Sequence, residues 1–166
     1  MFILTVGLVS LLGVMGMAMA RTEGSQQLGT SKQLANEALE SILTARETAN
    51  ITWSQIQNTG AGGIFLPGFN PIYQAGADGI IDTADDAASG YQILVLPGPD
   101  GIYGTADDIN EPLTNYQRQV QIVQANDNLG NPISGLRQVT ITINYYPPGF
   151  KVAQTYILQT YISAYR

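Results

Sequence analysis

The sequence contains no cysteine and no histidine among its 166 residues. A Ser-His-Asp triad, a Cys-His pair and zinc sites built on thiolate or imidazole ligands are therefore excluded. Disulfide bonds are excluded too, so any cross-link between loops must be of another kind. Charge is also scarce and acidic overall, with 7 basic and 13 acidic residues. We therefore expect no nucleic-acid partner, since nucleic-acid binding favours a basic face.

The first twenty residues, MFILTVGLVSLLGVMGMAMA, contain no charged residue and no proline. As a helix they would be about 30 Å long, the thickness of the hydrocarbon core of a bilayer. Such a stretch spans a membrane or is buried in protein on all sides. One alternative is a cleaved signal peptide, whose small-residue cleavage pattern Ala18-Met19-Ala20 matches, but no Lys or Arg precedes the apolar run. A plain membrane anchor for a soluble domain is a second alternative.

The helical pattern continues after Arg21 with a single apolar face. Apolar residues recur there at spacings of three and four: Leu28, Leu34, Ala35, Ala38, Leu39, Ile42, Leu43 and Ala45. The pattern stops at residues 48–50, before the glycine-rich stretch NTGAGG. The sequence therefore predicts one helix of roughly 45–50 residues, far longer than the helices of most globular proteins. Residues 1–22 form its apolar half and residues 23–50 its amphipathic half.

This helix, MFILTVGLVSLLGVMGMAMARTEGSQQLGTSKQLANEALESILTARE, resembles the type IV pilin family, which includes pseudopilins and minor pilins. The resemblance implies an α+β fold, in which the amphipathic half packs on the antiparallel sheet of a globular head at residues 51–166. It also implies that the apolar half lies first in the inner membrane and then in the core of a filament. Identical subunits would be its partners in a helical homopolymer, together with the pilus assembly machinery and a prepilin peptidase. No enzymatic activity is expected.

The family also has a basic leader, a peptidase cleavage site and a glutamate near the mature N-terminus, and this sequence shows none of them; position 5 is a threonine. The stretch MFILTVGLVSLLGVM looks like the part of the family helix that follows the glutamate. We therefore expect Met1 to be an internal methionine, preceded in the natural protein by a leader and several mature residues.

Acidic residues are concentrated in a repeated motif in the middle of the chain. The segment GADGIIDTADD at residues 76–86 recurs as GPDGIYGTADD at residues 98–108, with eight of eleven positions identical. No Lys or Arg occurs between Arg46 and Arg118. Because bunched carboxylates repel one another unless something neutralises them, the motif raises the question of a bound cation.

Closely spaced oxygen ligands around a glycine turn suit calcium, a hard cation that takes six to eight oxygens. The motif does not match the EF-hand pattern. It resembles the DGxxGTxDD-type loops of secreted bacterial proteins, which are similar to calcium-binding loops. The candidate ligands of the first loop are Asp78, Asp82, Asp85 and Asp86; those of the second are Asp100, Asp107 and Asp108.

Gly104 replaces the equivalent of Asp82, so we expect either a weaker second site or one ion shared by both loops. A solvated acidic loop without any ion is the alternative. Catalysis by paired acids, as in glycosidases, is disfavoured because it needs a cleft that raises the pKa of one acid.

The rest of the head reads as an antiparallel meander that covers the amphipathic half of the helix. Alternation of apolar and polar residues predicts strands at residues 91–96, 116–125, 138–146 and 151–161. Turns are expected at residues 126–132 and 147–149. Residues 62–73 are expected to form a loop with apolar anchors at Phe65, Leu66 and Phe69.

Together these features favour a structural subunit of an extracellular type IV pilus-like filament, with calcium-stabilised loops in the head and a role in adhesion or motility. A type II secretion pseudopilin or minor pilin is one alternative. A monomeric, membrane-anchored calcium-binding surface protein is the other.

Overall fold

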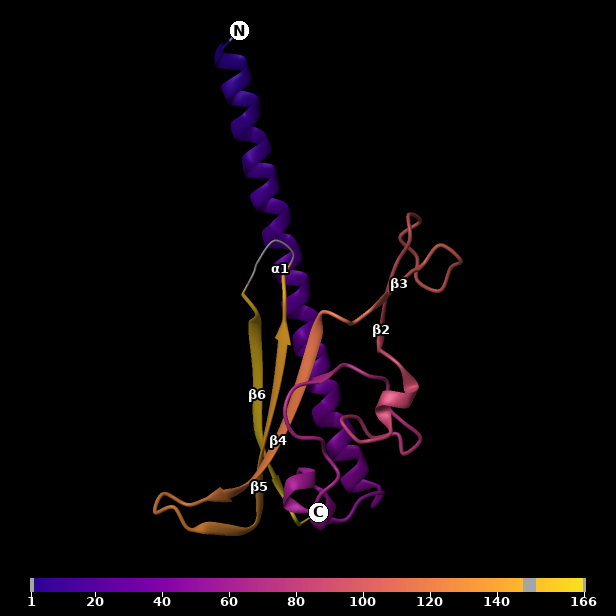
Figure 1. Ribbon diagram of the computed structural model, residues 1–166, viewed down its shortest axis with the longest axis vertical. Helices are drawn as coiled ribbons and strands as arrows, with labels where there is room; N and C mark the ends of the chain where they lie inside the picture. The colour runs from indigo at the N-terminus through magenta and orange to yellow at the C-terminus, as the bar shows by residue number, and fades with distance from the viewer. Residues whose placement is uncertain (1, 148–151, 166) are drawn as a thin grey trace.

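The computed structural model describes residues 2–147 and 152–165, and the side chains of residues 2–6 and 20 lie outside the description. A single long helix, α1 (Phe2–Glu47), runs along a head made of antiparallel strands, which confirms the predicted α+β class (Figure 1). The helix has 46 residues and ends one residue before the predicted boundary. Its last turn closes when the amides of Asn50 and Ile51 donate to the Ala45 carbonyl, at 2.9 and 3.2 Å, beside a left-handed Ala49.

The main sheet of the head has four antiparallel strands in the order β1–β4–β5–β6. These strands are β1 (Asn70–Pro71), β4 (Tyr116–Asn126), β5 (Pro132–Tyr145) and β6 (Gln154–Ser163). The three long strands form the predicted meander, because β4 pairs with β5 and β5 with β6. The alternating residues of β4 point alternately into the core and outward, which is the pattern from which the strand was predicted.

Several predicted boundaries are wrong. Strand β5 begins at Pro132 rather than at residue 138, because the β4–β5 hairpin continues past an irregularity between Gln124 and Asn126. Its turn is accordingly shorter, and the Asp127 side chain accepts the amides of Leu129 and Asn131 there. The short strand β1 lies inside the expected loop 62–73. Residues 148–151, which include parts of the predicted turn 147–149 and strand 151–161, lie outside the described residues.

The core lies between the C-terminal half of α1 and the main sheet. The helix buries five of its predicted apolar residues there: Leu34, Ala35, Ala38, Ile42 and Ala45. The sheet contributes the inward residues of its long strands, chiefly Val120, Ile122, Val139, Ile141, Ile143 and Ile162. Of the expected loop anchors, Phe65 is fully buried, whereas Phe69 is 43% exposed. This packing fixes the helix to the head, since each buried aliphatic side chain contributes roughly 1.5–3 kcal/mol.

A second, two-stranded sheet projects from the head beside the helix (Figure 1). It pairs β2 (Ile93–Leu96) with β3 (Ile109–Pro112), and we call residues 93–112 the arm. The predicted strand 91–96 is therefore two residues too long at its start. Strand β3 was not predicted, because the sequence INEP contains neither alternation nor β-branched residues beyond Ile109.

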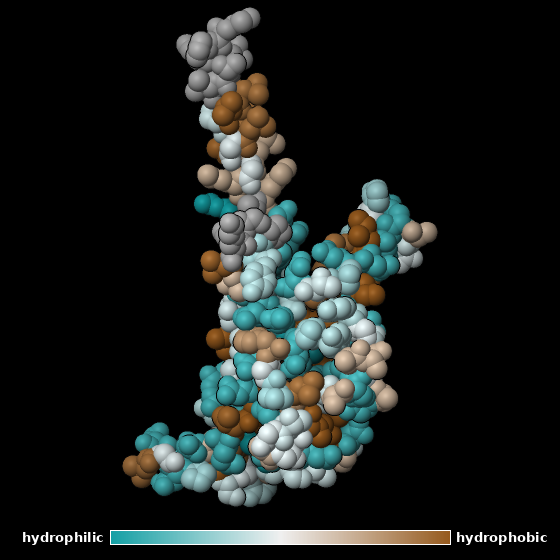
Figure 2. All heavy atoms as spheres, in the orientation of Figure 1, coloured by the Kyte–Doolittle hydropathy of each residue, from teal (hydrophilic) through white to brown (hydrophobic). Residues whose placement is uncertain are grey.

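The N-terminal half of α1 extends beyond the head (Figure 1). Its large apolar side chains are all more than half exposed: Leu8, Val9, Leu11, Leu12, Val14, Met15, Met17 and Met19. Figure 2 shows apolar atoms on this part of the helix, well away from the polar surface of the head. The remaining side chains of the predicted apolar half, at residues 1–6 and 20, lie outside the described residues. Within the described part of the chain, no helix combines the length and apolar character needed to cross a membrane.

Candidate functional site

The two acidic loops share most of their internal hydrogen bonds. In the first, the Thr83 hydroxyl donates to Asp85 Oδ1 at 2.7 Å, and in the second Thr105 donates to Asp107 at 2.6 Å. In the first loop the Asp78 amide also donates to Asp85, at 3.2 Å. In the second the equivalent Asp100 amide donates to Asp107, at 3.3 Å. The sequence repeat is therefore a repeat of backbone structure.

Glycine is required at the first position of each loop. A Cβ added at Gly76 would clash with the Asp85 carboxylate, and one added at Gly98 would clash with the Asp107 backbone and side chain. The turn that follows uses left-handed glycines, Gly79 with φ of 70° and Gly101 with φ of 71°. These positions explain why the spacing of glycine and aspartate is the same in both segments.

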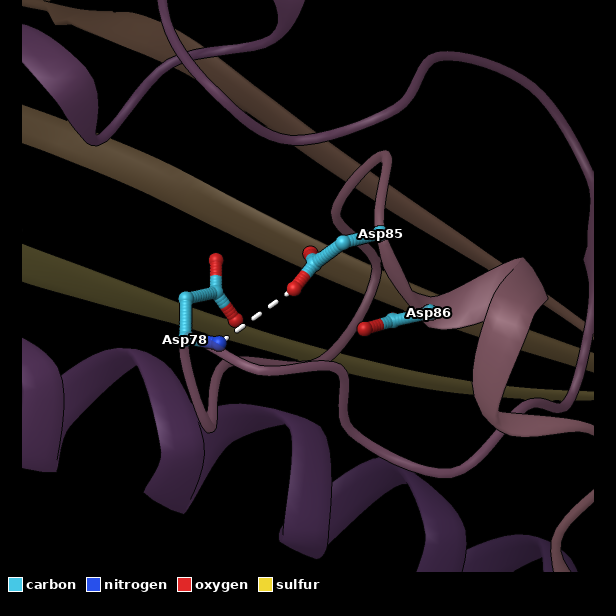
Figure 3. A group of neighbouring side chains, drawn as sticks. All are labelled: Asp78, Asp85 and Asp86. Atoms are coloured by element: carbon cyan, nitrogen blue, oxygen red, sulfur yellow. Dashed lines mark hydrogen bonds between the residues drawn. The ribbon is translucent and has the colours of Figure 1, made fainter.

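The first loop brings three carboxylates together (Figure 3). One oxygen each of Asp78, Asp85 and Asp86 lies within 4.8 Å of the others. Among the described residues these form the one group of three acidic side chains that is close enough to share a cation. Asp86 begins the short helix η3 (Asp86–Ser89), and its carboxylate accepts the amides of Gly76 at 2.9 Å and Asp82 at 2.6 Å.

The carboxylates of this group differ in how readily they lose their negative charge. The hydrogen bond from the Thr83 hydroxyl lowers the pKa of Asp85, which keeps this carboxylate ionised. Burial raises the pKa of Asp86, although several backbone amides donate to it. Both oxygens of Asp86 already accept two hydrogen bonds each, from Gly76, Asp82 and Thr83, whereas the oxygens of Asp78 and Asp85 accept fewer and retain lone pairs. Asp78 and Asp85 therefore still have oxygens to offer to a hard cation such as Ca²⁺, and Asp86 would exchange a hydrogen bond for the cation.

Asp82, the fourth candidate ligand of the first loop, does not join this group. Its side chain turns into the core, where Oδ1 lies 3.5 Å from Nε of Arg118, and both side chains are almost fully buried. Burial raises the pKa of Asp82 to about 6, even with the Arg118 guanidinium beside it. Asp82 thus anchors the loop to β4. Arg118 was missed in the sequence, although it occupies an inward position of the alternating strand, between Tyr116 and Val120.

The second loop lies at the tip of the arm (Figure 1) and is less closed. Asp108 Oδ2 accepts the Gly104 amide at 2.7 Å, but Asp108 Oδ1 has no hydrogen-bond partner, whereas Asp86 Oδ1 accepts the Gly76 amide. Asp100 and Asp107 are exposed. Among the described residues, the group of carboxylates close enough to share a cation includes none from the second loop, so the structure does not bring the two loops together around one ion.

No protein-family model matches the chain, and neither does any curated protein or solved structure. The functional inference therefore rests on the residues and geometry of the chain itself.

Proposed function

We propose that this chain is a structural subunit of an extracellular type IV pilus-like filament, assembled through the N-terminal half of α1. One observation carries the proposal: eight large apolar side chains between Leu8 and Met19 are each more than half exposed. They point to all sides of the helix, because their spacing covers the full turn of 3.6 residues. Contiguous apolar surface of this kind marks an interaction site.

Identical neighbours are the occupants that this geometry favours. A helix with apolar side chains on all sides needs cover on all sides, and neighbouring copies of the chain packed around it would supply that cover. The C-terminal half of the same helix is packed into the head through buried residues such as Ala38 and Ile42. Bundled N-terminal halves would therefore hold the heads on the outside. A head-to-tail arrangement of this kind does not close on itself and grows into a helical filament.

The remaining parts of the proposal follow from the family resemblance. Before assembly the subunit would lie in the inner membrane, and a prepilin peptidase and the pilus assembly machinery would act on it. The filament would serve in adhesion or motility, without catalysis.

We also propose that the first acidic loop binds Ca²⁺ through Asp78, Asp85 and Asp86. The support is the proximity of their oxygens, within 4.8 Å, and the ionised state of Asp85. A cation there would neutralise carboxylates whose mutual repulsion otherwise works against the loop. In a chain without cysteine, such an ion would do the work of a disulfide in clamping a loop to the head. The test is a titration of the purified chain with Ca²⁺, followed by its melting temperature with and without chelator.

The filament itself is tested by electron microscopy of the purified full chain after detergent removal. Long filaments with helical order would support the proposal and would exclude a pseudopilin or minor pilin that cannot polymerise alone. Cross-linking between cysteines placed at residues 6–17 gives the second measurement. A monomeric, membrane-anchored calcium-binding protein would give no ordered contacts between copies in this segment.

A further inference from the structure

The two acidic loops share a backbone but place their apolar residues in opposite environments. In the first loop Ile80 and Ile81 are buried, with 3% and 5% of their surface exposed. The equivalent residues of the second loop, Ile102 and Tyr103, are 60% and 66% exposed. Since the two loops share most of their internal hydrogen bonds, the difference in exposure follows chiefly from what each loop packs against.

The first loop packs against the helix of its own chain. The Ile81 amide donates to the Ser41 hydroxyl at 3.3 Å, and the Asn50 side chain donates to the Asp78 carbonyl at 3.5 Å. Ile80 and Ile81 lie with Ala45 around a shallow groove between this loop and α1. The first loop thus shows how the motif can pack: its apolar pair lies against a helix, and its carboxylates lie next to that pair.

The second loop lacks what would hold it to its own head. Gly104 stands where Asp82 pairs with Arg118 in the first loop. The arm that carries it is a two-stranded ribbon, and the side chains of Ile93, Val95 and Ile109 are all more than 40% exposed. Apolar atoms are visible along the projecting arm in Figure 2. On the other face of the ribbon Leu94 packs against the core of its own head. Because an isolated two-stranded sheet is marginally stable in water, the exposed face and tip of the arm are what remain to be covered.

We propose that Ile102 and Tyr103 dock on α1 of a second copy, beside its Met17 and Arg21, as the pair in the first loop docks on α1 of its own chain. The inference rests on the proposed filament, because it needs a neighbouring copy. Met17 and Arg21 are one helical turn apart and so share a face. Met17 is 69% exposed, and it offers the apolar surface that the pair requires.

Charge and apolar exposure together favour this part of the helix: Arg21 and Lys32 are both exposed cations of α1, but Arg21 is the one that lies one turn from a largely exposed apolar side chain, Met17. Arg21 is exposed and has no acidic partner among the residues that the structure describes. The arm tip presents Asp100, Asp107 and Asp108, and the pKa of Asp107 is lowered by the Thr105 hydroxyl, so its charge persists. The arm tip therefore complements this helix face: its two apolar side chains would contact Met17, and its carboxylates would lie beside Arg21.

Disulfide trapping tests the contact without interference, because the chain has no cysteine of its own. Tyr103→Cys chains and Met17→Cys chains, carrying tags of different mass, are mixed in detergent, assembled by detergent removal and mildly oxidised. We expect the disulfide between the two kinds of chain to be the main product. The matched control pairs Met17→Cys with Leu129→Cys, an 86% exposed residue at the tip of the β4–β5 hairpin, and should yield at least about tenfold less.

A second variant follows assembly directly. Ile102→Ser combined with Tyr103→Ser should lower the amount of filament while leaving the melting temperature of the head unchanged, because both side chains are exposed. If the wild-type chain forms filaments but the assembled Tyr103→Cys and Met17→Cys chains give no mixed disulfide, or a weaker one than the control pair with Leu129→Cys, this contact is overturned while the filament stands. Failure of the wild-type chain to form any filament would overturn both.

Discussion

Asp82 and Gly104 occupy the same place in the two acidic loops and share a left-handed backbone, with φ of 68° and 85°. A non-glycine residue in this conformation is uncommon and is tolerated best by Asp and Asn. In the first loop the side chain at this position reaches the buried Arg118, and in the second there is no side chain. One substitution within a repeated backbone thus separates a loop that is anchored to the sheet from one that is not.

Arg118→Met should be strongly destabilising at neutral pH, because it leaves the carboxylate of Asp82 buried without a cation. Removing one partner of a buried ion pair costs about 3–5 kcal/mol. Urea unfolding at pH 7 measures the loss. The Arg118 charge lowers the pKa of Asp82, so its removal raises that pKa further, and the cost should shrink at pH 4.5, where Asp82 is protonated.

The double variant Arg118→Met with Asp82→Asn is the control for this effect. It removes both charges from the core and should recover most of the lost stability, since replacing a buried pair by uncharged groups is often neutral or stabilising. Equal losses in the single and double variants would show that Arg118 contributes through its packing and not through its charge.

The pH dependence of wild-type stability should carry the signature of Asp82. Its pKa is about 6 in the folded protein, against 3.8 for an aspartate side chain in its ordinary state, so the folded state holds the proton more tightly. The resulting stability is fully present below pH 3.8 and is lost as the pH rises through 6. Relative to Asp82→Asn, the wild type should lose on the order of 3 kcal/mol between pH 4 and pH 7. Urea titrations in chelator measure this difference.

Two other substitutions test the same reasoning, one with no expected effect near pH 6 and one with an effect of the opposite sign. Gly104→Asp places a carboxylate at the equivalent left-handed position of the second loop, where nothing lies within 4 Å of an added Cβ, and should introduce no titration near pH 6. Asp85→Asn should act with the opposite sign, because the pKa of Asp85 is lowered, and the stability it contributes is present above the ordinary carboxyl pKa and lost as the pH falls.

Calcium binding should depend on Gly76. An alanine Cβ at this position would clash with the Asp85 carboxylate, which would have to rotate away from Asp78 and Asp86. Gly76→Ala should therefore abolish the rise in melting temperature on adding Ca²⁺, measured by differential scanning calorimetry. Gly60→Ala is the matched control, since nothing lies within 4 Å of its added Cβ and its φ is not positive. A wild-type melting temperature that ignores both Ca²⁺ and chelator would refute calcium binding itself.

The long helix and the meander could be predicted because their signals are local. The spacing of Leu34, Ala38 and Ile42 specifies a helix face, and the alternation in β4 specifies a strand, without reference to the rest of the chain. Strand β3 has no such pattern. It is a strand because β2 pairs with it along the arm, and a pairing such as that of Leu96 with Ile109 is not visible in either segment alone.

The repeat showed the same limit at the candidate site. Equal spacing of glycine and aspartate in the two segments goes with matching local structure, as the hydrogen bonds of Thr83 and Thr105 show. The separation of Asp82 from the other acids of its loop depends on Arg118, which is 36 positions away on strand β4. The exposure of Ile102 against the burial of Ile80 depends on which surface each loop meets. Both are tertiary outcomes that no local pattern encodes.

We expect the exposed N-terminal half of α1 to be needed for filament formation. The same half should contribute nothing to the stability of the head. Leu12 is 61% exposed and points away from the core, so Leu12→Asp should leave the melting temperature of the head unchanged. In a bundle of copies the same substitution buries an unpaired carboxylate against apolar neighbours, which is strongly unfavourable. We expect no filaments by electron microscopy. Leu129→Asp makes the same chemical change at an 86% exposed hairpin tip, and filaments should form. Normal assembly of Leu12→Asp would mean that this half of the helix is not the filament core.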